Sequence, residues 1–306
     1  MKNYSPEGKL LGTPANAAGL SSEGALTAAM EEERVLEARV VKCDKEYRLH
    51  VDLGVMKGII PKNEGAVGVA EGTVREIALI TRVGKAVQFT VTGFDVNENG
   101  ERIALLSRRR AQEKCMEDYV SRLVPGDVID AAVTHMEGFG AFMDVGAGVT
   151  ALLPVDNISV SRIAHPADRF APGDLIKAVV RSRDERGRIT LTHKELLGTW
   201  AENAAMIEAG ETVTGIVRSI ESYGVFVELF PNLAGLSERT EDYPVGTPVV
   251  VYIKNVNPGR MKVKLAIVGP GDPGEPPKEK LFFTGKHMDR FTYSPEESEK
   301  LVETIF

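Results

Sequence analysis

The chain has 306 residues, 43% of them hydrophobic, and a net charge of −7 from 37 Lys and Arg against 44 Asp and Glu. This length suits two to four small domains, and the acidic balance argues against a protein that wraps double-stranded nucleic acid through bulk positive charge. No apolar run approaches the roughly 20 residues of a membrane span. The first residues also lack the basic and apolar regions of a secretory signal, so we expect a cytoplasmic protein with no membrane partner.

The first third of the chain predicts an extension followed by strands. Residues 1–34 are rich in Ala, Gly, Ser and Pro and predict a flexible N-terminal extension. Residues 35–108 contain short alternating segments, in which 76–80 could pair with 86–91, and 54–61 reads as a turn. Closely spaced strands without long helices between them predict a small, divergent β-barrel.

The rest of the chain alternates helical connectors with two further strand-rich modules. The C-terminal part carries Ser294 as a helix N-cap, Pro295 at the first helical position and Glu297 as the capping-box acid. We therefore expect mostly β structure in three tandem five-stranded barrels joined by short helices. The expected segments are a helical connector at 109–123, a barrel at 124–192, a second helical connector at 193–209, a barrel at 210–268, and a linker with a short C-terminal helix at 269–306.

An aromatic motif recurs along the chain. Phe139 and Phe142 lie three residues apart with glycines beside the first, and Tyr223 and Phe226 repeat the pattern. Residues at this spacing face opposite sides of a flat strand, but a glycine between them permits a bulge that brings both rings to one face. A degraded copy keeps only Tyr47. Repeated aromatic pairs predict a stacking surface for flat ligands, of which nucleobases are the commonest.

The two later modules carry an ordered set of matching positions. In the first of them the set is Gly126, Val128, Phe139-Gly140-Ala141-Phe142, His165-Pro166, Asp184, Arg188, Ile189 and Leu191; in the second it is Gly210, Val213, Gly215, Val217, Tyr223-Gly224-Val225-Phe226 and Lys262. These modules resemble the RNA-binding domain named after bacterial small-subunit ribosomal protein S-one, a five-stranded OB-fold barrel. The three-module layout with its tail resembles the short, clostridial-type members of that family. Pro154 and Ser237 stand where the family often has a histidine.

The resemblance implies single-stranded RNA, including mRNA, as the ligand and the small ribosomal subunit as a partner. Early domains of the family dock onto the ribosome, which makes residues 35–108 a candidate docking unit. Candidate RNA-binding residues are Phe139, Phe142, Arg162, His165, Arg181, Arg183, Arg188, Tyr223, Phe226, Lys254, Arg260 and Lys262. The arginines could equally form a solvated charge run, Arg188 could form a turn ion pair with Asp184, and His165 could serve loop packing.

No catalytic arrangement stands out in the sequence. A nucleophile elbow, a phosphate-binding glycine-lysine loop and the His or Cys spacing of a metal site are all missing, and Cys43 and Cys115 lie far apart. We expect no catalytic residues, no metal and no cofactor. The leading hypothesis is a non-catalytic single-stranded RNA-binding protein acting in translation on the small ribosomal subunit. The alternative is an off-ribosome RNA-binding regulator or RNA-decay adaptor.

Overall fold

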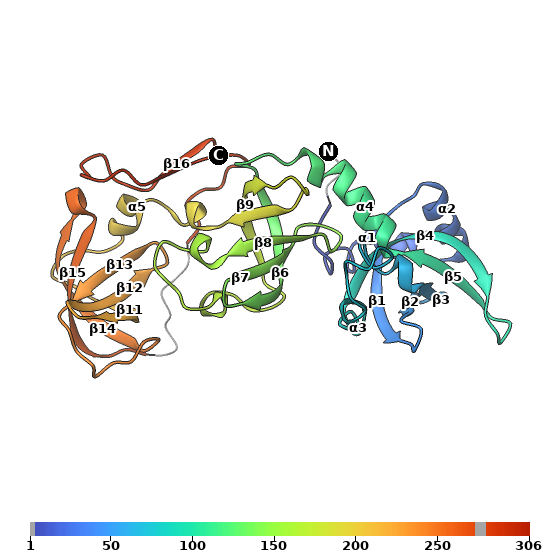
Figure 1. The fold of residues 1–306 in the computed structure, drawn as a ribbon, viewed down its shortest axis with the longest axis horizontal. Coiled ribbons are helices and arrows are strands. Elements are labelled where there is room, and N and C mark those ends of the chain that lie inside the picture. Colours follow the sequence, from blue (N-terminus) through green and yellow to red (C-terminus); the bar gives the residue numbers. More distant parts are fainter. Residues whose placement is uncertain (1–3, 273–279) are drawn as a thin grey trace. The chain divides into compact units, whose positions relative to one another are not determined.

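The computed structural model describes residues 4–272 and 280–306 and contains three closed five-stranded barrels (Figure 1). Each barrel has the same strand order, in which the third and fifth strands pair in parallel and close the barrel. The prediction of a mostly β chain with three tandem OB-type barrels is confirmed. The chain divides into two compact units: the first runs to Leu123 and includes Asp130–Ala132 and Asp144–Thr150, and the second holds the remainder.

The first barrel differs locally from the prediction. Ile77–Ile80 forms a helical turn, α3, in place of a strand: the N–H of Ile80 donates to the carbonyl of Glu76, and only Leu79 of the turn is buried. The third strand lies instead in the segment expected to be a turn, where Gly58 passes so close to Leu106 that a Cβ would meet its Cδ1 at 2.5 Å. The strands are β1 (Leu36–Cys43), β2 (Leu49–Asp52), β3 (Lys57–Ile60), β4 (Ala86–Val96) and β5 (Arg102–Ser107), with the 3-10 turn η1 (Lys62–Glu64) after β3.

Residues 4–34, expected as a flexible extension, instead pack on the first barrel. They form α1 (Pro14–Gly19) and α2 (Glu23–Glu31), and α2 packs against β4 (Figure 1). The side chains of Thr13 and Ser22 cap the two helices by accepting hydrogen bonds from backbone N–H groups. Leu26 is fully buried in the barrel core, so burial of apolar surface ties this segment down.

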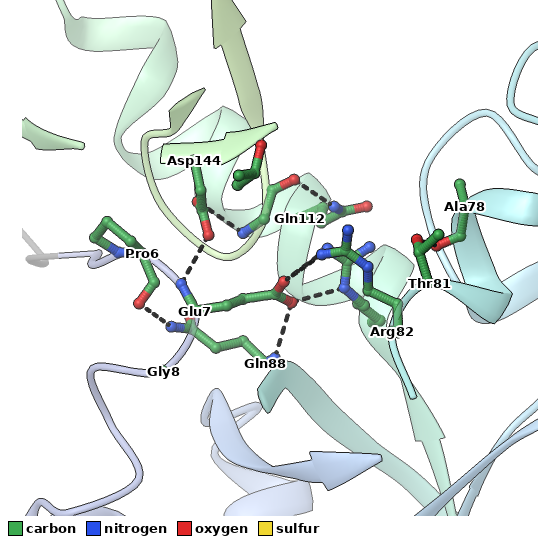
Figure 2. A network of polar contacts seen from close by, with 12 residues as sticks. Pro6, Glu7, Gly8, Ala78, Thr81, Arg82, Gln88, Gln112 and Asp144 are labelled. Carbon is green, nitrogen blue, oxygen red and sulfur yellow. Dashed lines mark hydrogen bonds and ion pairs between the residues drawn. The ribbon is translucent and has the colours of Figure 1, made fainter. Parts of the chain in front are cut away.

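A buried ionic network holds the start of the chain in place (Figure 2). The Glu7 carboxylate accepts two hydrogen bonds from the Arg108 guanidinium, at 2.6 and 2.9 Å, and lies 3.5 Å from Arg82 Nη1. It also accepts the backbone N–H of Gln88 at 3.1 Å. The backbone N–H of Glu7 donates to Asp144 Oδ2 at 2.7 Å. One residue near the N-terminus thereby connects β4, the helix that follows β5 and the last residue of the seventh strand.

Two more carboxylates complete this network. Asp144 is 2% exposed and accepts backbone N–H groups from Gly146 and Gly148 on its second oxygen. Burial, together with the nearby Glu7 carboxylate, raises the pKa of Asp144 to about 7. Glu37 is fully buried on β1. Its carboxylate accepts the backbone N–H groups of Gly8, Leu10 and Leu11.

The middle and third barrels repeat the topology of the first. The middle barrel comprises β6 (Val128–Glu137), β7 (Gly140–Asp144), β8 (Thr150–Pro154), β9 (Leu175–Arg183) and β10 (Ile189–Thr192), with the 3-10 turns η3 (Val155–Asn157) and η4 (Pro166–Asp168) between β8 and β9. The third comprises β11 (Thr212–Glu221), β12 (Gly224–Phe230), β13 (Leu233–Ser237), β14 (Pro248–Asn257) and β15 (Lys262–Pro270), with η6 (Pro258–Arg260) before β15.

The second connector is shorter than the sequence predicts, whereas the first has nearly the expected extent. The first, expected at 109–123, is α4 (Arg108–Asp118) followed by the 3-10 turn η2 (Val120–Arg122). The second, expected at 193–209, is η5 (Lys194–Leu197) and then α5 (Trp200–Ala204). Gly198 has a φ of +85°, which interrupts the helical path between them. Trp200 is 3% exposed and belongs to the core of the third barrel.

The C-terminal segment contains a hairpin where a short helix was predicted. It pairs β16 (Arg290–Thr292) with β17 (Glu303–Ile305). Ser294 accepts the backbone N–H of Val302 at 2.6 Å and so is engaged in the hairpin, not in a helix cap. Tyr293 donates its hydroxyl hydrogen to the carbonyl of Asn232 at 2.6 Å and anchors the hairpin on the third barrel. Part of the linker predicted at the start of 269–306 lies outside the described residues.

We predict a pH-dependent stability that centres on Asp144. Its folded pKa of about 7 lies above the usual value of 3.8, so the folded chain binds more protons than the unfolded chain between these values, and stability is lost as the pH rises from the lower value to the higher. The slope from one group is at most about 1.4 kcal/mol per pH unit. Asp144→Asn should give a flatter profile of thermal or urea unfolding between pH 5 and 8 than the wild type, whereas the exposed-site control Asp95→Asn should not. Parallel profiles for Asp144→Asn and wild type would contradict this.

Candidate nucleic-acid interface

The aromatic pair of the middle barrel sits at the hairpin between β6 and β7. Phe139 lies in the turn and is 58% exposed, while Phe142 lies on β7 and is half-buried. Their ring centroids are 5.9 Å apart with planes at 87°, an edge-to-face contact. A Cβ on Gly140 would meet the carbonyl oxygen of Leu153 at 2.6 Å. The glycine therefore allows β8 to approach closely, and the two rings lie together at the hairpin.

The third barrel repeats this geometry. Tyr223 lies in the turn between β11 and β12 and is 67% exposed, and its ring centroid is 6.1 Å from that of Phe226 at an angle of 89°. Gly224 has a φ of +155°, and a Cβ there would meet the carbonyl oxygen of Ser237 at 2.4 Å. The two barrels thus present matching edge-to-face pairs, which we call the aromatic pairs.

The first barrel has no such pair among its described residues. Tyr47 lies in the turn between β1 and β2 with a φ of +60°, is partly buried against the core, and has Lys62 Nζ 5.3 Å from its ring centroid. Asp44 accepts hydrogen bonds from the side chains of Arg48 and His50. Burial raises the pKa of Asp44, but these hydrogen bonds outweigh it and lower the pKa well below its usual range. The charged side chains of this hairpin are therefore paired with one another.

The arginines of the middle barrel have unequal surroundings. Arg188 donates to Asp184 Oδ2 at 2.6 Å, and hydrogen bonds from its backbone and side chain lower the pKa of that carboxyl. The turn ion pair weighed in the sequence is therefore present. Arg181 Nη1 lies 3.9 Å from the buried carboxylate of Glu195. Arg183 is exposed near the end of β9.

Two loop candidates follow β8. Arg162 is exposed. His165 caps η4. Its Nδ1 accepts the backbone N–H of Ala167 at 3.1 Å, and its backbone N–H donates to the Asp168 carboxylate at 3.3 Å. The structure thus gives His165 a role in loop structure, and an RNA contact by this residue stays a prediction.

The candidates of the third barrel lie around β14 and β15. Lys254 donates to Glu238 at 2.9 Å, and this hydrogen bond lowers the pKa of the Glu238 carboxyl. Arg260 lies in η6 and Lys262 begins β15, and both side chains are exposed.

His135, which is not among the candidates expected from the sequence, lies on β6 before the first aromatic pair. Its imidazole stacks on Phe142 with centroids 6.0 Å apart and planes at 19°. Its Nε2 also lies 2.7 Å from Glu137 Oε1. A signal was present in the sequence, because the cross-strand neighbours of an aromatic residue in a hairpin can be counted from the turn.

Buried polar contacts join the middle and third barrels within the second unit. Glu228 on β12 is fully buried and accepts hydrogen bonds from Arg169 at 2.5 Å and from Arg218 at 2.9 Å. Asn232 accepts the backbone N–H of Val160 and donates to two carbonyls of the second connector. Both aromatic pairs therefore belong to a single compact unit.

Within residues 4–272 and 280–306, no group of three or more His, Cys, Asp or Glu side chains is arranged to hold a metal ion. The described helices include none that is both long and apolar enough to cross a membrane.

The chain is similar in sequence to known proteins. Residues 123–194 match the model of the S1 RNA binding domain, so the middle barrel is a domain of this class. The chain is similar to small ribosomal subunit protein bS1 of Leuconostoc lactis, at 33% identity over 180 residues, covering 53% of this chain and 42% of that protein. It is also similar to the bS1 homolog of Bacillus subtilis, at 28% identity over 253 residues, covering 78% of this chain and 63% of that protein. The resemblance stated from the sequence is confirmed.

The chain spans less than two thirds of the length of both relatives. A crystal structure of a multidomain protein with nucleic acid binding domains from Streptococcus pneumoniae covers 76% of this chain and is itself covered to 72%, with 13% identity and a TM-score of 0.24.

We predict that the aromatic pairs bind ligand and do not hold the core. Because Phe139 is exposed, Phe139→Ala with Phe142→Ala should change the melting temperature little. The double substitution should weaken binding of an unstructured RNA oligomer at least about fivefold, since a stacked base contributes about 1–3 kcal/mol. Fluorescence anisotropy measures the affinity, and Tyr252→Ala, an exposed aromatic on β14 beside the start of β11, is the control. A large drop in melting temperature with unchanged affinity would assign the rings to the core.

Proposed function

We propose that this chain is a non-catalytic, cytoplasmic protein that binds single-stranded RNA, including mRNA, in translation on the small ribosomal subunit. The observation that carries the proposal is the exposed aromatic pair of the S1 domain, repeated with nearly equal geometry in the third barrel. Exposed rings next to glycines that allow close strand approach form a rigid surface on which bases can stack. Similarity to the bS1 proteins supports the setting in translation.

Such binding tolerates sequence and gains from repetition. A stacked base contributes about 1–3 kcal/mol whatever its identity, so one barrel binds weakly. Once one barrel has bound, the second binds the same RNA at a high effective concentration. The buried contacts around Glu228 and Asn232 keep the two barrels in one compact unit and so reduce the entropy lost when both engage.

Basic side chains of the same two barrels complete the proposed interface through phosphate contacts, which fix position without reading sequence. Exposed cations without a described carboxylate partner are the stronger candidates, namely Arg162, Arg260 and Lys262. Arg188 and Lys254 must share their charge with Asp184 and Glu238, so their net attraction for phosphate is reduced. Arg181 and Arg183 on β9 are the remaining proposed contacts.

We propose residues 35–108 as the unit that docks on the small ribosomal subunit. This barrel lacks an aromatic pair in its described residues, and its Tyr47 is partly buried. It exposes aliphatic side chains on and beside α3: Ile77 is 60%, Ile80 44% and Val83 43% exposed. Aliphatic residues gathered on one helical turn suit a protein surface better than a phosphate backbone.

Co-sedimentation with ribosomal subunits tests the setting. The wild-type chain should accompany the small subunit of its source cell at moderate salt. Ile77→Lys with Ile80→Lys should reduce that association because a charge replaces exposed apolar surface, and it should leave affinity for the RNA oligomer unchanged. Val96→Lys, at an equally exposed aliphatic site of the same barrel, is the control.

Three outcomes would count against this. Absence of the wild-type chain from small-subunit fractions would contradict the ribosomal setting and favour the off-ribosome regulator. An effect of Val96→Lys equal to that of the double substitution, or no effect of either, would remove the docking surface around α3.

A further inference from the structure

His135 distinguishes the middle barrel from the third. The imidazole is 65% exposed, lies nearly parallel to the Phe142 ring, and is hydrogen-bonded to Glu137. Phe142 therefore contacts one ring face-on and another, Phe139, edge-on. Three rings lie together at one hairpin.

The third barrel has no histidine at the position that corresponds to His135. Aligning Phe139 with Tyr223 places Ser219 at the position of His135 and Glu221 at that of Glu137. Ser219 pairs with Phe226 across the β11–β12 hairpin, beside a register shift between Val217 and Ser219. His135 contacts Phe142 and the aligned Ser219 pairs with Phe226, so the third barrel has a hydroxyl where the middle barrel has a ring. Each barrel keeps the glutamate, and only the middle barrel has an imidazole next to it.

We propose that His135 is a base-stacking residue of the middle barrel, which makes this barrel the tighter of the two RNA sites; the inference rests on the proposed RNA-binding function. The hydrogen bond to Glu137 fixes the plane of the imidazole, so less rotamer entropy is lost when a base contacts it. Contact with Phe142 continues the aromatic surface from β7 onto β6. The same imidazole, when protonated, forms an ion pair with a carboxylate that would otherwise repel phosphate at this edge.

The carboxylate of Glu137 gives the histidine a second task at this position. Glu137 is itself exposed and close to the turn that carries Phe139. Unpaired, its charge opposes an approaching phosphodiester chain, as Glu221 does in the third barrel. His135 provides both a ring for stacking and a hydrogen bond to the carboxylate. Ser219 has no ring and so cannot provide both.

Substitutions separate these two contributions in the full chain. His135→Ala removes ring and hydrogen bond, His135→Gln keeps a donor for Glu137 without a ring, and His135→Phe keeps a ring without a donor. If stacking carries the effect, Ala and Gln should weaken binding of an unstructured RNA oligomer roughly fivefold to a hundredfold, the range of one stacked base. Phe should bind close to wild type. Because the side chain is exposed, the melting temperature should not change.

The reverse substitution gives an independent test. In a chain carrying Phe139→Ala and Phe142→Ala, RNA binding depends on the third barrel. Adding Ser219→His there should strengthen binding by restoring a ring opposite Phe226 beside Glu221. Ser219→Gln in the same chain is the matched control and should not strengthen it.

The outcomes distinguish the two proposals. If substituting both aromatic pairs with alanine leaves RNA affinity unchanged, the proposed function itself fails. If those substitutions weaken binding but His135→Ala and His135→Gln bind as the wild type does, only the role of His135 is overturned. His135→Phe binding as weakly as His135→Ala would equally overturn stacking as its contribution.

Discussion

Buried carboxylates determine how the segments of this chain come together. A buried ionised group is costly unless it is paired and hydrogen-bonded, so each one requires its partners to be present. Glu7 and Glu37 bind groups from the first barrel and from the N-terminal segment, and Asp144 binds the N-terminal segment in turn. Glu228 has the same role between the middle and third barrels. Removing one partner of such a group costs about 3–5 kcal/mol in stability, whereas a single surface ion pair contributes about 0–1 kcal/mol.

The aromatic pairs depend on that framework only indirectly. Their geometry comes from a hairpin turn, one exposed ring in it, and a glycine that lets the next strand approach. Nothing in the core requires Phe139 or Tyr223, which leave more than half of their surface in solvent. Large exposed rings that recur at one position on two barrels mark an interaction surface. The core of the middle and third barrels and their exposed aromatic rings are thus built from different residues.

Local sequence patterns predicted the barrels but not the contacts between distant segments. Alternation and the repeated motif are local, so strands and aromatic pairs could be found from them. The Glu7–Arg108 ion pair joins residues far apart in the chain, and no periodicity reveals it. The sequence around Ser294 was read as a helix start because it matches a capping box locally. The hydrogen bond that Ser294 accepts from Val302 is not local, and it places Ser294 in a hairpin instead. His135 was not among the expected residues because its contact with Phe142 joins two strands, and spacing along one strand does not reveal it.

The three barrels differ at one hairpin, where the middle and third barrels carry an exposed aromatic pair and the first carries a ring packed on the core. In the first barrel the hairpin between β1 and β2 is a turn whose backbone matches the turn from Asp184 to Arg188 in the middle barrel, with Tyr47 in the left-handed position that Gly187 occupies there. A tyrosine in that conformation is strained and persists because it packs on the core and on Lys62. The ring is thereby committed to the fold. A barrel whose hairpin ring packs on the core in this way exposes no aromatic pair at that hairpin, whereas the middle and third barrels each expose one.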